Sequence, residues 1–170
     1  MPVMDDDKII RAARKYARKY GTTDPETLAG KLRITVSEED FPSLKGMYIV
    51  IKRNVFIMLN KNLDPVMRRI VLFHELGHHV LHRKETQAFR ELSLFSNMET
   101  NRMEYEANLF AAELSLPDDE ILEYIYEGRD VAFIAAAMQS DVNLVALKVK
   151  ILNRRGHEFR LQVYRNKFLK

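Results

Sequence analysis

Apolar residues recur every three to four positions along most of this chain, and this spacing predicts a largely helical protein. Asp24-Pro25 and Asp64-Pro65 are typical of helix starts, while Gly21 and Gly128 follow the last apolar position of a helix. The helices predicted on this basis cover residues 5–20, 24–32, 64–82, 102–115, 117–127, 131–139 and 142–155.

Shorter apolar stretches have the composition of β-strands. Met47–Ile51 is rich in β-branched residues, and Arg53-Asn54 has the character of a turn into Val55–Leu59. We expect an antiparallel hairpin packed against the helix 64–82, so the fold class is α+β with a small antiparallel sheet. Three further expectations are a short strand at 34–36, a loop with some helix at 83–101, and a terminal strand at 159–164.

Composition and charge place the chain among globular proteins. Its 170 residues suffice for a single domain with a buried core, and 46% hydrophobic and 30% charged residues are typical of a soluble protein. The acidic N-terminus has no apolar signal segment and no stretch reaches the length of a membrane span, so we expect a cytoplasmic protein without membrane contact. A net charge of +3 is too small to indicate nucleic-acid binding.

The segment His74-Glu75-Leu76-Gly77-His78 has the spacing of a metal site on a helix. Histidines four residues apart lie one turn apart on the same face, where both imidazoles can reach one Zn²⁺. The chain has no cysteine, so a zinc ion has to be bound by histidine and carboxylate. Glu75 is turned about 100° away along the helix and can act as general base on a metal-activated water. The motif therefore predicts a zinc-dependent peptidase with one zinc ion, in which Glu75 is catalytic.

A site with two histidines needs a third ligand, and the helix 102–115 offers two glutamates. Glu104 shares its side of this helix with Asn108 and other small, uncharged residues, so a second helix can approach there. Glu106 shares its side with Arg102, which predicts solvent exposure and an ion pair four residues apart. We expect Glu104 to bind the zinc, with Asn108 supporting the site. Glu106 is the alternative third ligand.

Several neighbours of the motif have less specific signals. Gly77 inside the helix costs about 1 kcal/mol relative to alanine, which is explained if another segment approaches closely beside His78. The oxyanion of the reaction needs a donor, and His79, His82 and Tyr105 are candidates. His82 also suits a structural role at the helix C-terminus. The pair His78 and His82 has metal-binding spacing too, but it lacks the following carboxylate and is less favoured.

The two helices predicted at 131–139 and 142–155 invite comparison with a helix-turn-helix motif. The second helix has four basic residues, but the turn between the helices lacks glycine and apolar residues crowd the second helix. Direct nucleic-acid binding is therefore not favoured.

These motifs resemble the ImmA/IrrE family of metallopeptidases. The likeness begins with residues 74–78 and His82, and it continues with 104–114 and Pro117, which are close to that family's E-x-E-A-N-x-F-A-A-x-L-x-x-P segment. It covers about residues 22–117 and is loose beyond that point. The first glutamate of this segment, Glu104, looks like the zinc ligand of glutamate-type zincins.

The resemblance implies a zincin-like fold and a cytoplasmic zinc protease that cleaves a helix-turn-helix transcriptional repressor. Such proteins are often carried by prophages or mobile elements. We expect one metallopeptidase domain over residues 1–170, with a catalytic core at about 22–117 and a helical C-terminal extension at about 117–170. Two alternatives stay open: a non-catalytic regulatory protein that binds a repressor or DNA around a structural zinc, and a zinc peptidase that acts on small peptides.

Overall fold

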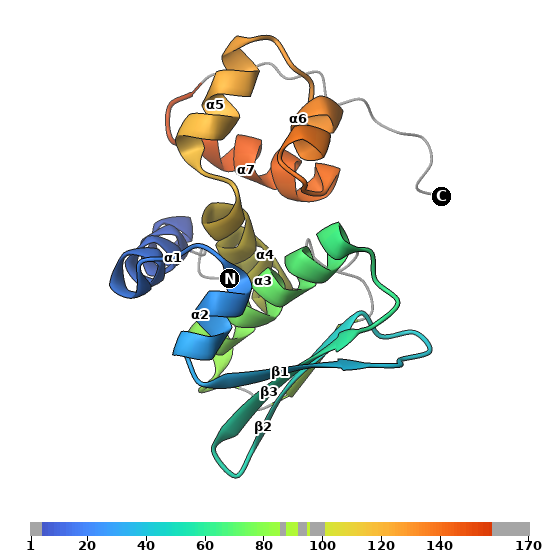
Figure 1. Ribbon diagram of the computed structural model, residues 1–170. Helices are drawn as coiled ribbons and strands as arrows, with labels where there is room; N and C mark the ends of the chain where they lie inside the picture. The colour runs from blue at the N-terminus through green and yellow to red at the C-terminus, as the bar shows by residue number, and fades with distance from the viewer. Residues whose placement is uncertain (1–4, 86–87, 92–94, 96–100, 158–170) are drawn as a thin grey trace.

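The computed structural model describes residues 5–85, 88–91, 95 and 101–157 (Figure 1). Two helices, three strands, a third helix and a fourth strand follow one another in the first part of the chain, and only helices come after them among the described residues. The elements are α1 (Asp6–Tyr20), α2 (Pro25–Lys31), β1 (Ile34–Glu39), β2 (Gly46–Ile51), β3 (Asn54–Asn60), α3 (Pro65–His82), β4 (Ala88–Glu91), α4 (Arg102–Ser115), α5 (Asp118–Tyr126), α6 (Val131–Ala137) and α7 (Val142–Arg154).

The helices begin and end where the capping residues predict. The Asp64 carboxylate accepts a hydrogen bond from the Met67 amide at 3.0 Å, and proline fills the first turn of α3. Helix α1 ends at Gly21, whose left-handed backbone (φ 67°) suits glycine. Each predicted helix is confirmed to within two residues, and the largest difference is the end of α6 at Ala137.

The sheet has the strand order β1-β3-β2-β4. Strands β2 and β3 form the predicted antiparallel hairpin, and the turn lies at Lys52-Arg53, one residue earlier than expected. The expectation of a purely antiparallel sheet is wrong, because β1 pairs in parallel with β3. Residues 40–45 carry the chain past the place of β3, which then returns between β1 and β2. The sheet is therefore mixed.

One predicted segment differs from expectation, and another lies outside the described residues. Ala88–Glu91 forms strand β4 against β2, within a segment that we expected to be loop and helix. Its four residues contain no β-branched side chain, so pairing with β2 rather than intrinsic propensity produces the strand. The terminal strand predicted at 159–164 falls outside the described residues.

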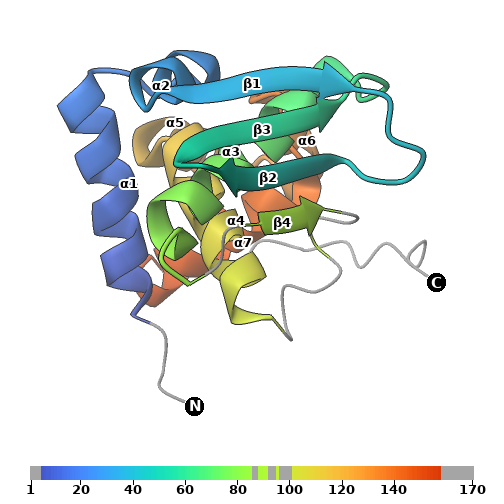
Figure 2. The ribbon, with the colours of Figure 1, turned by 90° about the horizontal axis from the view of Figure 1, so that it is seen from below.

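Helix α3 lies at the centre of the molecule, between the sheet and α4 (Figure 1, Figure 2). The sheet covers one side of α3, α4 packs on another, and α5, α6 and α7 lie beyond α4 on the side away from the sheet. Because neighbours surround it, α3 is buried at every position from Ile70 to His79. The histidine motif therefore lies in the interior rather than on an amphipathic surface.

A buried ion pair joins α7 to α4. The Lys148 ammonium, with 1% of its side chain exposed, lies 2.6 Å from a carboxylate oxygen of Glu113 on α4. Arg14 of α1 contacts the other oxygen of Glu113 at 2.7 Å. The pairing satisfies an otherwise costly buried charge and fixes α1 and α7 to the helix that carries the glutamate motif.

No single helix among the described residues has the length and apolar composition to cross a bilayer. Helices α6 and α7 pass such a test only when taken together, and they are bent by 113° relative to each other.

Candidate metal centre

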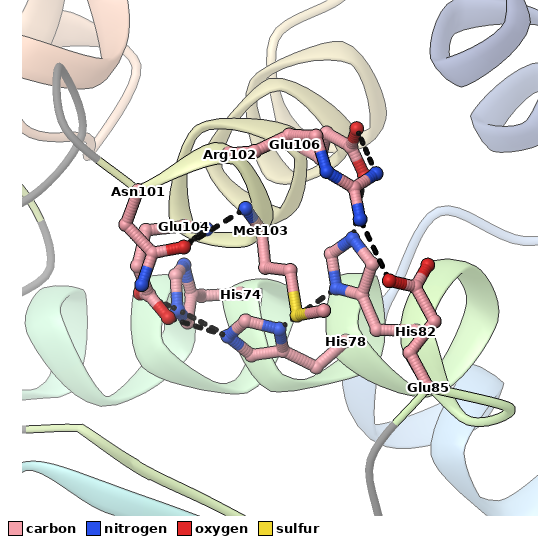
Figure 3. Close-up of polar contacts among 9 residues, drawn as sticks. All are labelled: His74, His78, His82, Glu85, Asn101, Arg102, Met103, Glu104 and Glu106. Atoms are coloured by element: carbon pink, nitrogen blue, oxygen red, sulfur yellow. Dashed lines mark hydrogen bonds and ion pairs between the residues drawn. The ribbon is translucent and has the colours of Figure 1, made fainter. Parts of the chain in front are cut away.

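Helices α3 and α4 bring three potential ligands to one point (Figure 3). His74 and His78 project from successive turns of α3, and their Nε2 atoms lie 3.0 Å apart. Glu104, from the first turn of α4, places its carboxylate oxygens 3.1 Å from Nε2 of His74 and 3.4 Å from Nε2 of His78. The structure thus brings together the three residues predicted as ligands.

These separations are those that a tetrahedral metal site requires. Donor atoms that lie about 2.0–2.1 Å from a tetrahedral zinc ion are about 3.3 Å from one another. The three distances among the two imidazoles and the carboxylate fall close to that value. Two neutral imidazoles and one carboxylate also form a donor set typical of catalytic zinc. The residues present fit a bound divalent metal.

Burial keeps these groups in the protonation states that a metal needs. Burial lowers the pKa of His78 to about 4, so its imidazole is neutral near pH 7. Burial alone would raise the pKa of Glu104, but hydrogen bonds from His74 and His78 lower it well below its usual range. The carboxylate is therefore ionised and the imidazole is free of an extra proton, as ligation demands.

The close approach of α4 to α3 occurs at Gly77. A Cβ atom at this position would lie only 2.9 Å from both the Cα and the carbonyl oxygen of Ala107 on α4. The predicted gap beside His78 is confirmed, and α4 is the segment that fills it. This contact brings α4 close enough for the Glu104 carboxylate to reach both histidines.

The side chain of Asn108 supports the first histidine. Its Oδ1 atom lies 2.9 Å from Nδ1 of His74, and both residues are fully buried. Accepting a hydrogen bond from Nδ1 leaves the Nε2 lone pair of His74 facing Glu104 and His78. The structure places Asn108 where the sequence predicts support for the site.

The structure corrects the predicted surroundings of Glu106. The ion pair with Arg102 is present at 2.9 Å, but Glu106 is buried rather than solvent-exposed. Its other oxygen lies 2.6 Å from Nε2 of His82. Sequence reasoning missed this contact because it assumed one exposed side for α4, whereas the helix is buried all around from Glu106 to Leu114.

Glu75 is fully buried on the side of α3 that faces the sheet. Gly46, the first residue of β2, lies directly against it: a Cβ there would be 3.3 Å from Oε1 of Glu75 and 2.7 Å from a methyl group of Val71. Nothing in the sequence reveals this contact between Gly46 and a residue 29 positions later.

The three residues predicted as candidate oxyanion donors each contact another side chain. Both ring nitrogens of His82 are used, one toward His78 and one toward Glu106. The Tyr105 hydroxyl donates to Asp6 of α1 at 3.3 Å, so the structure directs this side chain away from the role proposed for it. Nδ1 of His79 lies 3.2 Å from the Tyr48 hydroxyl, and burial lowers the pKa of His79 to about 4.

Comparisons with known proteins agree with this geometry. The model of the peptidase M78 family, described as the IrrE N-terminal-like domain, matches residues 29–150. The chain is 40% identical over 119 residues to uncharacterized immunity region protein 2 of Bacillus phage phi105, covering 68% of this chain and 73% of the relative. It is 30% identical over 122 residues to the metallopeptidase ImmA of Bacillus subtilis (strain 168), covering 69% and 70%.

Proposed function

Because the chain belongs to the peptidase M78 family of IrrE N-terminal-like domains, we propose that it is a zinc-dependent endopeptidase that cleaves a helix-turn-helix transcriptional repressor. The family resemblance predicted from the motifs is confirmed, and at the level of the family the chain is a metallopeptidase. The choice of zinc, the substrate and the roles of individual residues are our proposal.

One observation carries the proposal. Nε2 of His74, Nε2 of His78 and the carboxylate of Glu104 converge from two helices on a single point, and Glu75 adjoins the first ligand in the chain. A purely structural zinc site usually has four protein ligands, whereas a catalytic site has three and leaves one position for water. Three converging donors among the described residues, with Glu75 next to the first of them in the sequence, therefore favour catalysis.

The roles of the side chains follow from their positions. When bound, zinc lowers the pKa of water and polarises the substrate carbonyl. Glu75 accepts the proton of the attacking water and delivers it to the leaving amine. His74 and Glu104 hold ligand atoms toward the common point, and Asn108 fixes the orientation of His74. Gly46 leaves room for the Glu75 carboxylate beside β2.

The nature of the substrate is inferred from the relatives. One relative is named for the immunity region of a phage, and this name supports a role connected with a repressor. Together with the family resemblance, this supports a cytoplasmic helix-turn-helix repressor as the proposed protein substrate. A peptidase for small peptides is less well supported, because nothing in the relatives' names points to such peptides.

The contacts of α7 disfavour direct DNA binding. Lys148 is buried against Glu113, Arg154 lies 2.9 Å from Asp6, and Arg155 lies 3.6 Å from Asp118. Of the four basic residues on the second predicted helix, Lys150 alone is exposed without an ion pair among those described. A recognition helix needs several free basic side chains for phosphate contacts.

Co-expression with a helix-turn-helix repressor encoded beside this protein tests the proposal. We expect the repressor to appear as two fragments beside the wild-type chain and as one intact band beside Glu75→Gln. The Glu75→Gln variant should retain about one zinc per chain by mass spectrometry, because Glu75 is not a ligand. An intact repressor beside a zinc-loaded wild-type chain would support the regulatory binding protein instead.

A further inference from the structure

A chain of hydrogen bonds extends from the candidate metal ligand His78 to the protein surface (Figure 3). Nδ1 of His78 lies 3.0 Å from Nδ1 of His82, and Nε2 of His82 lies 2.6 Å from Glu106. The second oxygen of Glu106 accepts from Arg102 at 2.9 Å, and Arg102 also donates to Glu85 at 2.6 Å.

Metal binding at His78 would fix the donor and the acceptor in each hydrogen bond of the series from His78 to Glu106. A metal ion takes the lone pair of Nε2, so the proton of His78 sits on Nδ1 and is donated to His82. Nδ1 of His82 then acts as acceptor, which leaves its proton on Nε2, pointing at Glu106. A carboxylate is an acceptor only, so it completes the series without conflict. A metal ion at one end and the carboxylate at the other would thus favour the same tautomers of the two imidazoles.

The two histidine ligands are supported by different chemistry. His74 donates to the amide oxygen of Asn108, whereas His78 is connected through His82 to the carboxylate of Glu106. A hydrogen bond to a carboxylate makes an imidazole a more basic ligand than one to an amide does. The carboxylate end therefore strengthens the His78 ligand beyond holding its ring in place.

The residues of this hydrogen-bonded series differ in burial: those near the candidate metal position are buried, and those at its far end are exposed. His78 and His82 are fully buried and Glu106 exposes 9% of its side chain, so these contacts are made in a medium of low dielectric. Arg102 and Glu85 expose 50% and 42%, and ion pairs at such positions contribute little.

From these contacts we infer that His82 and Glu106 are positioning residues that set the affinity of His78 for the metal. The inference rests on the metal site of the proposed function and extends it to two residues that supply no ligand atom themselves. The predicted effect is a 10–100-fold loss of metal affinity on removal of either, the range typical of partners of ligating histidines.

The test measures the dissociation constant for zinc by competition with a chromophoric chelator, on chains shown to be folded by circular dichroism. We expect Glu106→Gln and His82→Gln each to weaken binding about 10–100-fold, and Glu85→Gln to change it less than about threefold. The double variant with both substitutions should lose no more zinc affinity than the single variant that binds zinc more weakly, because His82 and Glu106 act on His78 in series.

Glu113→Gln is the matched control, since Glu113 is also a buried glutamate of α4 but pairs with Lys148. It should lower thermal stability and leave the zinc dissociation constant unchanged. If Glu106→Gln and His82→Gln bind zinc within twofold of wild type, the positioning role is overturned and the peptidase proposal stands. If Glu106→Gln abolishes binding while Glu104→Gln preserves it, Glu106 is itself a ligand. If the wild-type chain binds no divalent metal, both proposals fall.

Discussion

Gly77 and Ala107 form the point at which α3 and α4 come closest, with a virtual Cβ at Gly77 only 2.9 Å from the backbone of Ala107. The contact lies between the two turns of α3 that carry His74 and His78. The two atoms at this distance are the Cα and the carbonyl oxygen of Ala107. Because both belong to the backbone, no change of a side-chain rotamer on α4 can make room for a side chain at position 77. The helices would have to separate, and Glu104 would move away from the histidines.

Gly77→Ala should therefore destabilise the fold by about 1–3 kcal/mol, although alanine is the better helix former. It should also weaken zinc binding, because the shift of α4 carries Glu104 with it. Urea denaturation and zinc competition measure the two effects. Gly30→Ala is the control: it lies in α2 with nothing within 4 Å of the added methyl, so it should stabilise by about 0.4–1 kcal/mol. A stabilising Gly77→Ala would contradict the close-packing argument.

Gly46→Ala should separate catalysis from metal binding. The three atoms nearest to the added methyl belong to Val71, Glu75 and Met58, and none of these residues is a candidate ligand. Displacement of a general base by a fraction of an ångström is expected to lower the turnover of repressor cleavage by about tenfold or more. Zinc content, measured by mass spectrometry, should stay at the wild-type level. Equal loss of zinc and activity would show that Gly46 acts on the whole site.

Glu104→Ala should remove tight metal binding. Two histidines remain, but the anionic ligand is gone, so the loss of zinc affinity should exceed about 100-fold, beyond the range for a residue that only orients a ligand. Chelator competition beside Asn108→Ala provides the comparison, because Asn108 contacts His74 and not the metal position. An unchanged affinity in Glu104→Ala would mean that the third ligand lies elsewhere.

Asp118 should contribute to stability in a pH-dependent manner. Burial opposes ionisation, but the hydrogen bond and the charge of Lys148 lower the pKa of Asp118 in the folded protein. The unfolded chain, with a pKa of about 3.9, therefore binds more protons in acid, and this stabilisation is lost as pH falls through the folded pKa. The stability difference between wild type and Asp118→Asn should be largest near pH 7 and shrink below about pH 4.

Urea denaturation across this range measures the Asp118 effect. Asp119→Asn removes an acid from the same helix start at an exposed position and should show a smaller difference at every pH. A difference for Asp118→Asn that stays constant down to pH 3 would contradict the assignment.

Local signals in the sequence were sufficient for the helices, for the β2–β3 hairpin and for the ligand cluster. Proline and aspartate at positions 64–65 and glycine at 21 mark helix ends by backbone chemistry that needs no tertiary partner. The spacing of His74 and His78 is likewise local, and the small residues beside Glu104 indicated the face that meets α3.

What the sequence did not reveal depends on contacts between distant segments. The parallel pairing of β1 with β3 follows from the path of residues 40–45, and Ala88–Glu91 becomes a strand only because β2 offers an edge. The burial of Glu106 arises because helices cover α4 on several sides, which a single amphipathic period does not predict. Its contact with His82 is apparent only once α3 and α4 are placed side by side.

The placement of candidate ligands on both α3 and α4 has a consequence for the intervening chain. A metal held by His78 and Glu104 is a cross-link that closes a loop of about 26 residues, much as a disulfide would. Closing a loop of that length lowers the entropy of the unfolded chain by an amount worth about 3.5 kcal/mol at 25 °C. Metal supply would then act on the lifetime of the protein as well as on its chemistry. A chain starved of metal would be easier to unfold and would be cleared sooner by the proteases of the cell.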